Sequence, residues 1–234
     1  MSTTVWPKTV PVLTADQERI RDEWMKIWLT EHQSKGLLSV LVEQFNHRYP
    51  LRSASKGART LEVGAGVGAH AAFEDLDSQD YHCVELRQEL CDEISRRYPK
   101  AHAAVGDCQQ RLDFPDAHFD RAIAIHVLEH LPDLPRALDE IRRVLKPDGR
   151  FSVVIPAEGG LGYQLAREIS SKRLFEKRFH TSYDWYIKSE HVNSAREVLA
   201  ELERTFVVDH QLYYPALVPS VDLNLLIGLT LKPR

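Results

Sequence analysis

Short apolar runs alternate with helical stretches through the middle of the chain. Five runs have the length and composition of buried strands, and two stretches between them repeat apolar residues at the spacing of a helix face. Strands and helices in alternation predict an α/β fold, with a parallel sheet joined by right-handed crossovers. The strands are expected at residues 60–63, 81–85, 101–105, 120–126 and 150–155, and the helices at 87–98 and 135–145.

Two helices are expected before this alternating region. Thr14 has the position of an N-cap, with Gln17 as its capping-box partner, and apolar residues then recur on one helix face. A second helical run covers 37–45, and the polar, glycine-containing segment 52–57 has the composition of a linker. We therefore predict an N-terminal arm and helical cap over residues 1–56.

The last third of the chain has a different pattern. Helical spacing extends over a long basic stretch, an aromatic-rich segment follows, and two runs with strand composition end the chain. We expect these last strands to pair at the sheet edge and to complete a single domain over 57–234, in which 157–193 is an insertion that covers the substrate. The expected elements are helices over 161–179 and 194–203 and strands over 206–214 and 223–231.

Composition narrows the class of protein. The 234 residues are 43% apolar and 27% charged, which is globular, and the net charge of −4 gives no footprint for nucleic acid. Cys83, Cys91 and Cys108 form no C-x-x-C pair, as in a reducing compartment. No apolar run approaches the roughly 20 residues of a membrane span, and the polar N-terminus lacks the features of a signal peptide. We expect a cytoplasmic protein, a monomer or a homodimer.

The first expected strand runs into a glycine-rich turn. Gly64, Gly66 and Gly68 allow unusual backbone dihedrals and let a ligand approach the main chain closely. A helix expected after the turn would direct its N-terminal N–H groups at an anionic part of that ligand. The turn by itself is a weak signal, because tight turns without ligands have the same composition.

Three carboxylates lie at expected strand ends. Glu62 precedes the glycine turn, Glu85 ends the next strand, and Asp107 follows the third. In an open parallel sheet, ligands bind beyond the carboxyl ends of the strands, and an acid about 20 residues past the turn can accept both hydroxyls of a ribose. Asp107 could accept from the exocyclic amine of adenine. The three together indicate a nucleoside-containing ligand.

The motifs along residues 60–156 resemble those of the class I S-adenosylmethionine-dependent methyltransferases. The likeness is to the small-molecule branch that includes the ubiquinone and biotin pathway enzymes, and it rests on six segments in the right order. It implies a Rossmann-like, seven-stranded sheet with strand order 3-2-1-4-5-7-6 and strand 7 antiparallel. The segments are Leu61–Gly68, Glu85, Gly106-Asp107, Phe114–Asp120, His126–Leu131 and Leu145–Gly149.

This resemblance also implies a cofactor site and a reaction. S-adenosyl-L-methionine would donate a methyl group to a small-molecule acceptor and leave as S-adenosyl-L-homocysteine. The glycine turn and Glu62 would hold the methionine part, Glu85 the ribose, and Asp107 with Cys108 the adenine, while His126 would lie near the sulfonium. The predicted cofactor-binding residues are Glu62, Gly64, Ala65, Gly66, Gly68, Glu85, Leu86, Asp107, Cys108, Gln109 and His126.

Two other patterns compete for the same residues. The turn from Gly64 to Ala69 also satisfies the G-x-G-x-x-A fingerprint of dinucleotide sites, but that fingerprint leaves Glu62 and Asp107 unexplained. Residues 126–130 match the H-x-x-E-H pattern of metallopeptidases, whose two histidines must lie on one face of a continuous helix. Here the first histidine ends a strand, so we expect no metal ligand.

The acceptor is less well defined by the sequence. The region after the fourth strand lacks the Asn/Asp-Pro-Pro-Tyr/Phe segment of enzymes acting on DNA or protein amines, which favours a small molecule. Its attacking N or O needs a base only if it carries a proton, and His130 is the candidate catalytic base. Aromatic side chains could form a slot for a planar ring, or could pack an added subdomain. They are Trp24, Tyr183, Trp185, Tyr186 and Tyr213.

Three functions remain open from the sequence. The first is N- or O-methylation of a small, aromatic or heterocyclic metabolite of the natural-product type. The second is methylation of a lipid quinone or a sugar. The third is a methyltransferase-like module that binds the cofactor without catalysis. A closed aromatic pocket would favour the first, an open apolar trough the second, and a blocked pocket the third.

Overall fold

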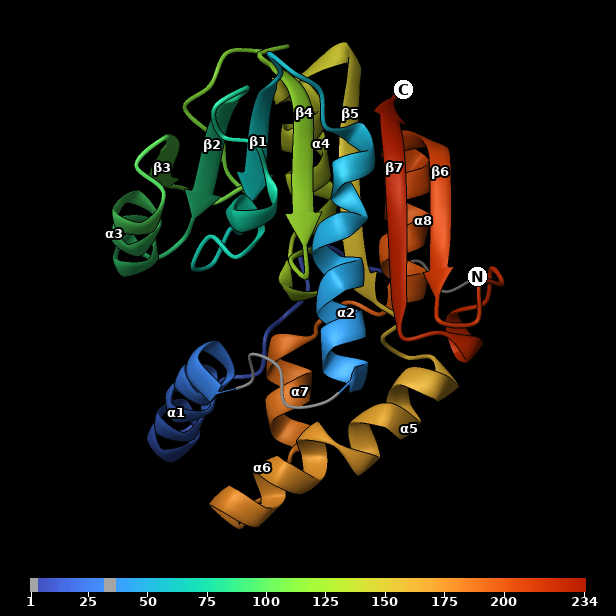
Figure 1. The fold of residues 1–234 in the computed structure, drawn as a ribbon. Coiled ribbons are helices and arrows are strands. Elements are labelled where there is room, and N and C mark those ends of the chain that lie inside the picture. Colours follow the sequence, from blue (N-terminus) through green and yellow to red (C-terminus); the bar gives the residue numbers. More distant parts are fainter. Residues whose placement is uncertain (1–3, 32–36) are drawn as a thin grey trace.

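One mixed sheet of seven strands forms the centre of the molecule, a computed structural model that describes residues 4–31 and 37–234. The strand order is β3-β2-β1-β4-β5-β7-β6, and β7 runs antiparallel to both of its neighbours (Figure 1), which confirms the predicted topology. The strands are β1 (Arg59–Val63), β2 (Asp80–Glu85), β3 (Ala101–Val105), β4 (Phe119–Ile125), β5 (Leu145–Pro156), β6 (Phe206–Tyr214) and β7 (Leu226–Pro233).

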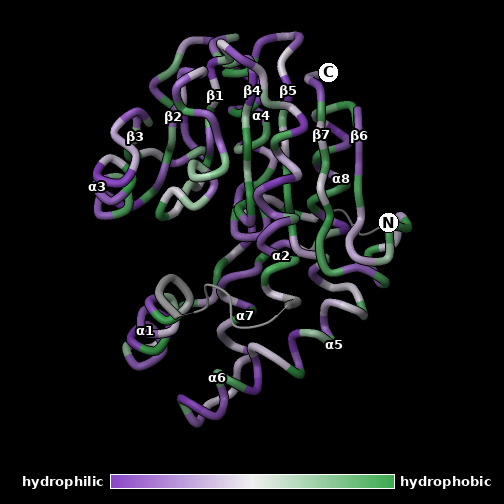
Figure 2. Tube along the Cα trace, in the orientation of Figure 1, coloured by the Kyte–Doolittle hydropathy of each residue, from purple (hydrophilic) through white to green (hydrophobic). Residues whose placement is uncertain are grey.

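Helices cover both faces of this sheet. On one face, α4 (Leu134–Val144) and α8 (Ala195–Thr205) pack on the apolar side chains of β1, β4, β5 and β7 and form the main core. On the other face, α3 (Gln88–Arg97) packs near β2 and β3, while α2 (Leu37–Arg48) lies in front of the central strands (Figure 1). The tube in Figure 2 is mainly hydrophobic along β4 and β7, where nearly all residues are buried.

The expected helix after the glycine turn does not form. The chain between β1 and β2 contains only a short 3-10 helix, η2 (His70–Phe73). Its surroundings explain the difference: α2 occupies the adjacent space, and the ring of His47 stacks on those of His70 and Phe73 with centroids 5.6 and 4.8 Å away. The prediction that a helix N-terminus would serve an anionic ligand here is therefore wrong.

A separate helical layer lies beyond the carboxyl ends of the parallel strands. It consists of α1 (Ala15–Glu31), α5 (Leu161–Ile169), α6 (Ser171–Phe179) and α7 (Asp184–Glu190), as Figure 1 shows. The stretch predicted as one helix is therefore two, which meet at Ser170, whose backbone leaves helical dihedrals. Trp24 of α1 is fully buried in this layer, with its ring 5.3 Å from that of Phe175.

The two N-terminal helices do not form one cap. The predicted Thr14 capping box is present, because the Thr14 amide donates to Gln17 Oε1 and the Gln17 amide to Thr14 Oγ1. After this start, α1 joins the helical layer, whereas α2 lies on the sheet and leads into η1 (Pro50–Ser53). The arm before α1 is held by Lys8, whose amide donates to the Pro132 carbonyl. Among the described helices, none has the length and apolar content needed to cross a bilayer.

A buried ionic network fixes η1 to the sheet. Arg121 of β4 is 1% exposed, and its Nη1 lies 2.7 Å from Glu74 Oε1. The other guanidinium nitrogens donate to the Pro50 carbonyl and the Ser53 hydroxyl. His70 Nε2 lies 2.8 Å from the same Glu74 oxygen. One guanidinium therefore joins β4, η1 and the segment after η2.

Acid should weaken the fold through Glu74. Burial raises the pKa of this carboxyl, but the contacts with His70 and Arg121 outweigh burial and lower the pKa from 4.5 to about 2. Stability from the ionised carboxylate is thus fully present above pH 4.5 and is lost as the pH falls toward 2. The difference of 2.5 pH units corresponds to about 3 kcal/mol.

Urea unfolding between pH 2 and 7 measures this contribution. The wild-type chain should lose more free energy of unfolding between pH 4.5 and 2 than Glu74→Gln, because the variant has no carboxyl to protonate at this position. Glu129, another buried carboxylate, is common to both proteins and cancels in the comparison. Parallel pH profiles of the two proteins would contradict the assignment.

Candidate functional site

The glycine turn lies at the carboxyl end of β1, and its three glycines have left-handed backbone conformations. Gly64, Gly66 and Gly68 have φ values of +66°, +56° and +74°, which residues with a Cβ rarely adopt. A Cβ at Gly64 would lie only 2.5 Å from Cγ2 of Val127, so the turn passes directly against the segment after β4. At Gly68 the space for a Cβ is taken by the ring of Tyr98.

A pocket opens where the carboxyl ends of β1, β2, β3 and β4 meet. Its volume is about 60 Å³, so it would hold only part of a nucleoside-sized ligand. The lining is mostly apolar, with the carboxylates of Glu85 and Asp107 at its rim. The lining residues are Val63, Gly64, Val84, Glu85, Leu86, Gly106, Asp107, Cys108, Val127 and Leu131. A larger, open hollow of about 290 Å³ lies between η1 and η2, away from these strand ends.

The two carboxylates at this pocket are oriented by backbone amides. Glu85 accepts from Gly66 N–H at 3.0 Å through one oxygen and from Leu86 N–H at 3.0 Å through the other. Asp107 Oδ1 accepts from the Gln109 amide at 2.9 Å. Burial and the neighbouring Asp107 raise the pKa of the Cys108 thiol to about 12, so this group remains a protonated S–H.

Glu62 does not lie at the pocket as the sequence predicted. Its side chain is buried on the opposite face of β1, where Tyr81 donates to Glu62 Oε2 at 2.8 Å and the Cys83 thiol lies 3.9 Å away. Burial raises the pKa of Glu62, opposed by His70 and by the Tyr81 hydrogen bond. Strand alternation explains the difference, since Val63 faces the pocket and its neighbour must face away.

The other predicted cofactor residues lie in or beside the turn and the pocket. Ala65 is buried beneath the turn, and Gln109 Oε1 accepts from the Asp133 amide at 2.8 Å. His126 follows β4 with a φ of +53°, and its neighbour Val127, rather than His126, lines the pocket. Val127 and Leu131 lie within the segment His126–Leu131 of the resemblance but were not predicted as site residues, because apolar residues after a strand are common in cores.

A cluster of polar side chains, called the polar group below, lies next to the pocket at the end of β4. Its members are His126, Glu129, His130, Glu158, Arg167 and His191. Glu129 is 2% exposed, and its Oε1 lies 3.3 Å from His126 Nδ1 and 3.8 Å from His130 Nε2. Burial raises the pKa of Glu129, but the contacts with His126 and the nearby His130 and His191 outweigh burial and lower the pKa to about 2. Of the two histidines of the H-x-x-E-H run, His126 follows β4 and His130 ends the short η3 (Leu128–His130), so the helical peptidase geometry is absent from this described segment.

The chain segments after β5 and α7 complete this polar group. His191 Nδ1 lies 2.8 Å from Glu158 Oε2, and Arg167 binds both oxygens of Glu158 at 2.6 and 2.7 Å. His130 and His191 are in edge contact, with ring centroids 4.9 Å apart. The sequence did not predict His191, Glu158 or Arg167 as members of this group. Glu158 follows β5 closely, so the strand-end rule that identified Glu85 could have found it, whereas nothing in the sequence connects residue 191 to residue 130.

The predicted aromatic residues do not form one group. Trp24, Tyr183 and Tyr186 are buried together with Phe175 in the core of the helical layer, and Trp185 packs against them. Tyr213 lies apart from them, on β6, where it packs on the main core. Of the two interpretations of these residues, the surroundings of Trp24 favour packing of a subdomain, because the side chain has no exposed surface.

Comparison with known proteins relates residues 61–153 to a family. This stretch matches the model described as "Methyltransferase domain". A sterol 4-C-methyltransferase from Caenorhabditis elegans is 33% identical over 171 residues, which are 67% of this chain and 47% of the relative. A 2-phytyl-1,4-naphtoquinone methyltransferase from Trichormus variabilis is 26% identical over 175 residues, covering 74% of this chain and 68% of the relative. The chain thus spans about half the length of the sterol relative.

The fold is also shared with solved structures. A TehB-like SAM-dependent methyltransferase from Corynebacterium glutamicum superposes with a TM-score of 0.60 at 18% identity, covering 94% of this chain and 99% of that one. The superposition therefore extends beyond the matched stretch, to the helical layer and the last strands. At this identity the likeness concerns the fold.

Proposed function

The domain matched at residues 61–153 belongs to the class I S-adenosylmethionine-dependent methyltransferases, and on this premise we propose that the chain methylates a small molecule. The observation that carries the proposal is the pocket at the carboxyl ends of β1 to β4. It combines a glycine turn with the carboxylates of Glu85 and Asp107 at the ends of β2 and β3, where an open parallel sheet binds a nucleoside-containing ligand. The cofactor of this class fits such a set of groups.

We assign the parts of the cofactor to residues of the pocket. Glu85 binds the ribose hydroxyls, since its oxygens retain acceptor capacity beyond the hydrogen bonds from Gly66 and Leu86. Asp107 and the Cys108 thiol bind the adenine edge, and Gly64 lets the methionine part approach the backbone. When bound, S-adenosylmethionine supplies a methyl group on a positively charged sulfur, so the protein has mainly to position the acceptor and exclude water.

The polar group beside the pocket is the proposed acceptor site. His130 is the proposed proton acceptor, because its Nδ1 lies 2.7 Å from the Glu190 carbonyl. A carbonyl only accepts, so Nδ1 carries the proton and Nε2 is free to take one from an acceptor hydroxyl or amine. This arrangement supports N- or O-methylation of a small molecule, for which we propose an aromatic or heterocyclic acceptor.

A lipid quinone is the second candidate acceptor. Leu161, Leu165 and Ile169 follow one face of α5 and are 69%, 65% and 58% exposed, which gives an apolar surface on the helix that also carries Arg167. One relative is named for a phytyl naphthoquinone, which supports the same choice. The apolar surface would hold a prenyl-like tail, while the quinone head lies at His130.

Methyl transfer from labelled S-adenosylmethionine into a host extract tests the proposal. Label should appear in the small-molecule or lipid fraction, and Glu85→Ala should reduce both label and calorimetric affinity for the cofactor at least about tenfold, because a carboxylate hydrogen bond is lost. Glu89→Ala, at an exposed position in α3, is the matched control and should retain both. Label in protein or nucleic acid would refute the substrate class, and cofactor binding without label in any fraction would favour a non-catalytic module.

A further inference from the structure

Three side chains of the polar group have the composition of a metal site. One carboxylate oxygen of Glu129 and one ring nitrogen each of His130 and His191 lie within 4.8 Å of one another. Glu129 and His130 come from η3 after β4, whereas His191 comes from the segment after α7, 61 residues further along the chain. Two imidazoles and one carboxylate are the ligands of many catalytic zinc sites and of non-haem iron sites.

Glu129 gives independent evidence for a cation. Its side chain is 2% exposed, and neither of its oxygens has a hydrogen-bond donor in acceptable geometry. Buried carboxylates normally accept hydrogen bonds or pair with a permanent charge. Within the described part of the chain, the contacts of Glu129 with basic side chains are those with the imidazoles of His126 and His130, at 3.3 and 3.8 Å, and it pairs with no lysine or arginine. A divalent cation would supply the missing partner.

Both histidines are oriented as metal ligands usually are. The Nδ1–H of His130 donates to the Glu190 carbonyl, and the Nδ1 of His191 lies 2.8 Å from the Glu158 carboxylate. Arg167 holds that carboxylate through both oxygens. A carboxylate or carbonyl that receives one ring N–H fixes the tautomer and leaves Nε2 as the nitrogen with a free lone pair.

The segment that carries His191 is fastened to η3. Asn193 Nδ2 donates to the carbonyls of Leu128 and Leu131 at 2.8 Å each, and the Asn193 amide donates to the Glu129 carbonyl at 3.0 Å. On the other side, Lys8 Nζ donates to the Val192 carbonyl at 2.8 Å. The three ligands are therefore held together by hydrogen bonds that do not involve their own side chains.

We propose that Glu129, His130 and His191 bind one divalent transition-metal ion, with Glu158 and the Glu190 carbonyl orienting the two imidazoles. Leu131 and Val127, which flank these ligands in sequence, line the pocket assigned to the cofactor, so the ion would lie at the acceptor side of that pocket. This inference rests on the proposed function and changes one role in it: with the ion bound, His130 Nε2 is a ligand and no longer the proton acceptor. An acceptor hydroxyl then binds the ion and loses its proton to water. Its oxygen takes the methyl group from the sulfonium, which becomes a neutral thioether.

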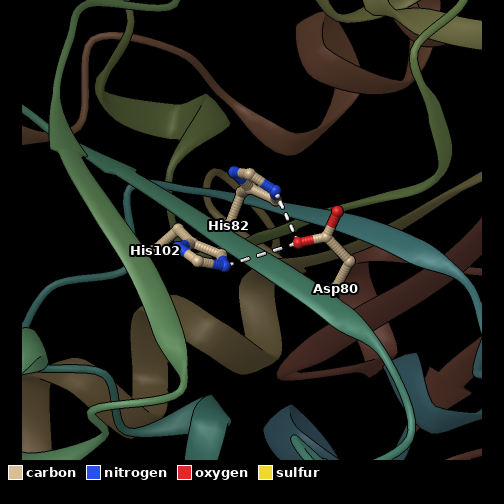
Figure 3. Close-up of side chains that lie close together, drawn as sticks. All are labelled: Asp80, His82 and His102. Atoms are coloured by element: carbon tan, nitrogen blue, oxygen red, sulfur yellow. Dashed lines mark hydrogen bonds and ion pairs between the residues drawn. The ribbon is translucent and has the colours of Figure 1, made fainter.

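A second group, Asp80, His82 and His102, serves as the comparison (Figure 3). Both imidazoles contact one oxygen of Asp80, at 2.8 and 3.6 Å, near the start of β2 and far from the carboxyl strand ends. This group is partly exposed, and the guanidinium of Arg59 already neutralises the other Asp80 oxygen at 3.0 Å. It therefore lacks the unpartnered buried carboxylate that Glu129 provides.

Zinc titration of the metal-free full-length chain, in competition with a chromophoric chelator and without S-adenosylmethionine, tests the site. One equivalent of Zn²⁺ should bind, and Glu129→Gln and His191→Gln should each weaken binding at least about a hundredfold, because a direct ligand is lost. Glu158→Gln, which removes the charge that orients His191, should weaken it about 10–100-fold. His102→Gln is the matched control and should change nothing.

Thermal unfolding of each variant, followed by circular dichroism, establishes that the compared proteins are folded. Binding of Co²⁺ in place of Zn²⁺ should give a visible absorption band in wild type that Glu158→Gln shifts. Absence of stoichiometric binding, or equal loss in His102→Gln and His191→Gln, would overturn the proposal. Cofactor affinity is measured separately, so a failed methyl-transfer assay with intact zinc binding would count against the proposed function alone.

Discussion

Replacing Arg121 by methionine is expected to lower the free energy of unfolding by about 3–5 kcal/mol. The guanidinium is buried in β4 and is the partner of Glu74, Pro50 and Ser53, so methionine fills much of the space but leaves a buried carboxylate without its fixed charge. Urea denaturation at pH 7 measures the loss. It should greatly exceed that of Arg96→Met, whose exposed pair with Glu93 is worth less than about 1 kcal/mol.

The double variant Arg121→Met with Glu74→Gln separates the pair from the packing. A neutral glutamine still accepts hydrogen bonds from its neighbours but no longer needs the charge of the guanidinium. The free energy of unfolding lost in the double variant should therefore be smaller, by roughly 0.5–3 kcal/mol, than the sum of the losses in the two single variants. Additive losses would show that Arg121 acts through its contacts with η1 alone. If Arg121→Met is as stable as Arg96→Met, the buried pair of Arg121 and Glu74 does not stabilise the fold.

Gly64→Ala should damage both the fold and the cofactor pocket. A Cβ at this position lies 2.5 Å from Val127 Cγ2 at a φ of +66°, so left-handed strain of about 1–2 kcal/mol adds to an overpacking cost of about 1–3 kcal/mol. Relief requires Val127 to move, and Val127 lines the pocket. Calorimetric titration with S-adenosylmethionine should therefore show at least about a tenfold loss of affinity, equal to about 1.4 kcal/mol.

Gly57→Ala is the matched control for this prediction. Gly57 lies before β1, outside the pocket lining, with a φ of +79°, and a Cβ there has no heavy atom within 4 Å. Only the left-handed strain of about 1–2 kcal/mol applies, and the pocket wall stays in place. Equal effects of the two substitutions on cofactor affinity would mean that the close contact with Val127 is unimportant.

The central sheet was predictable because its signals are local. Each strand can be recognised from the length and apolar content of its own residues, and Glu85 and Asp107 from their places at strand ends. The strand order came from the resemblance. The boundary errors are also local. The strand predicted at 150–155 begins earlier, at Leu145, because Leu145 pairs with Phe119 across an irregular register.

The site differs from its expected layout in several places. Strand alternation directs Glu62 to the Tyr81 side of the sheet, and its role at the cofactor stays a prediction. The helix after the turn is absent because α2 fills its place, which no pattern around the turn reveals. His191 and Glu158 join His130 only through the folded segments after α7 and β5. The sequence alone therefore singled out Glu85 and Asp107, which line the pocket, and His126 and His130 beside it, but not their partners His191, Glu158 and Arg167.

The stacking of α2 on η2 also bears on how much chain the sheet requires. In a doubly wound fold, the crossover between two neighbouring strands usually carries the helix that covers them, but here the crossover from β1 to β2 has only η2, which packs against α2 from before β1. A shorter chain beginning at Gly57 would lose His47, Pro50 and Ser53, exposing the rings of η2 and leaving Arg121 without two of its hydrogen-bond acceptors. Residues 37–56 are therefore part of the structure that the sheet needs, although they precede its first strand.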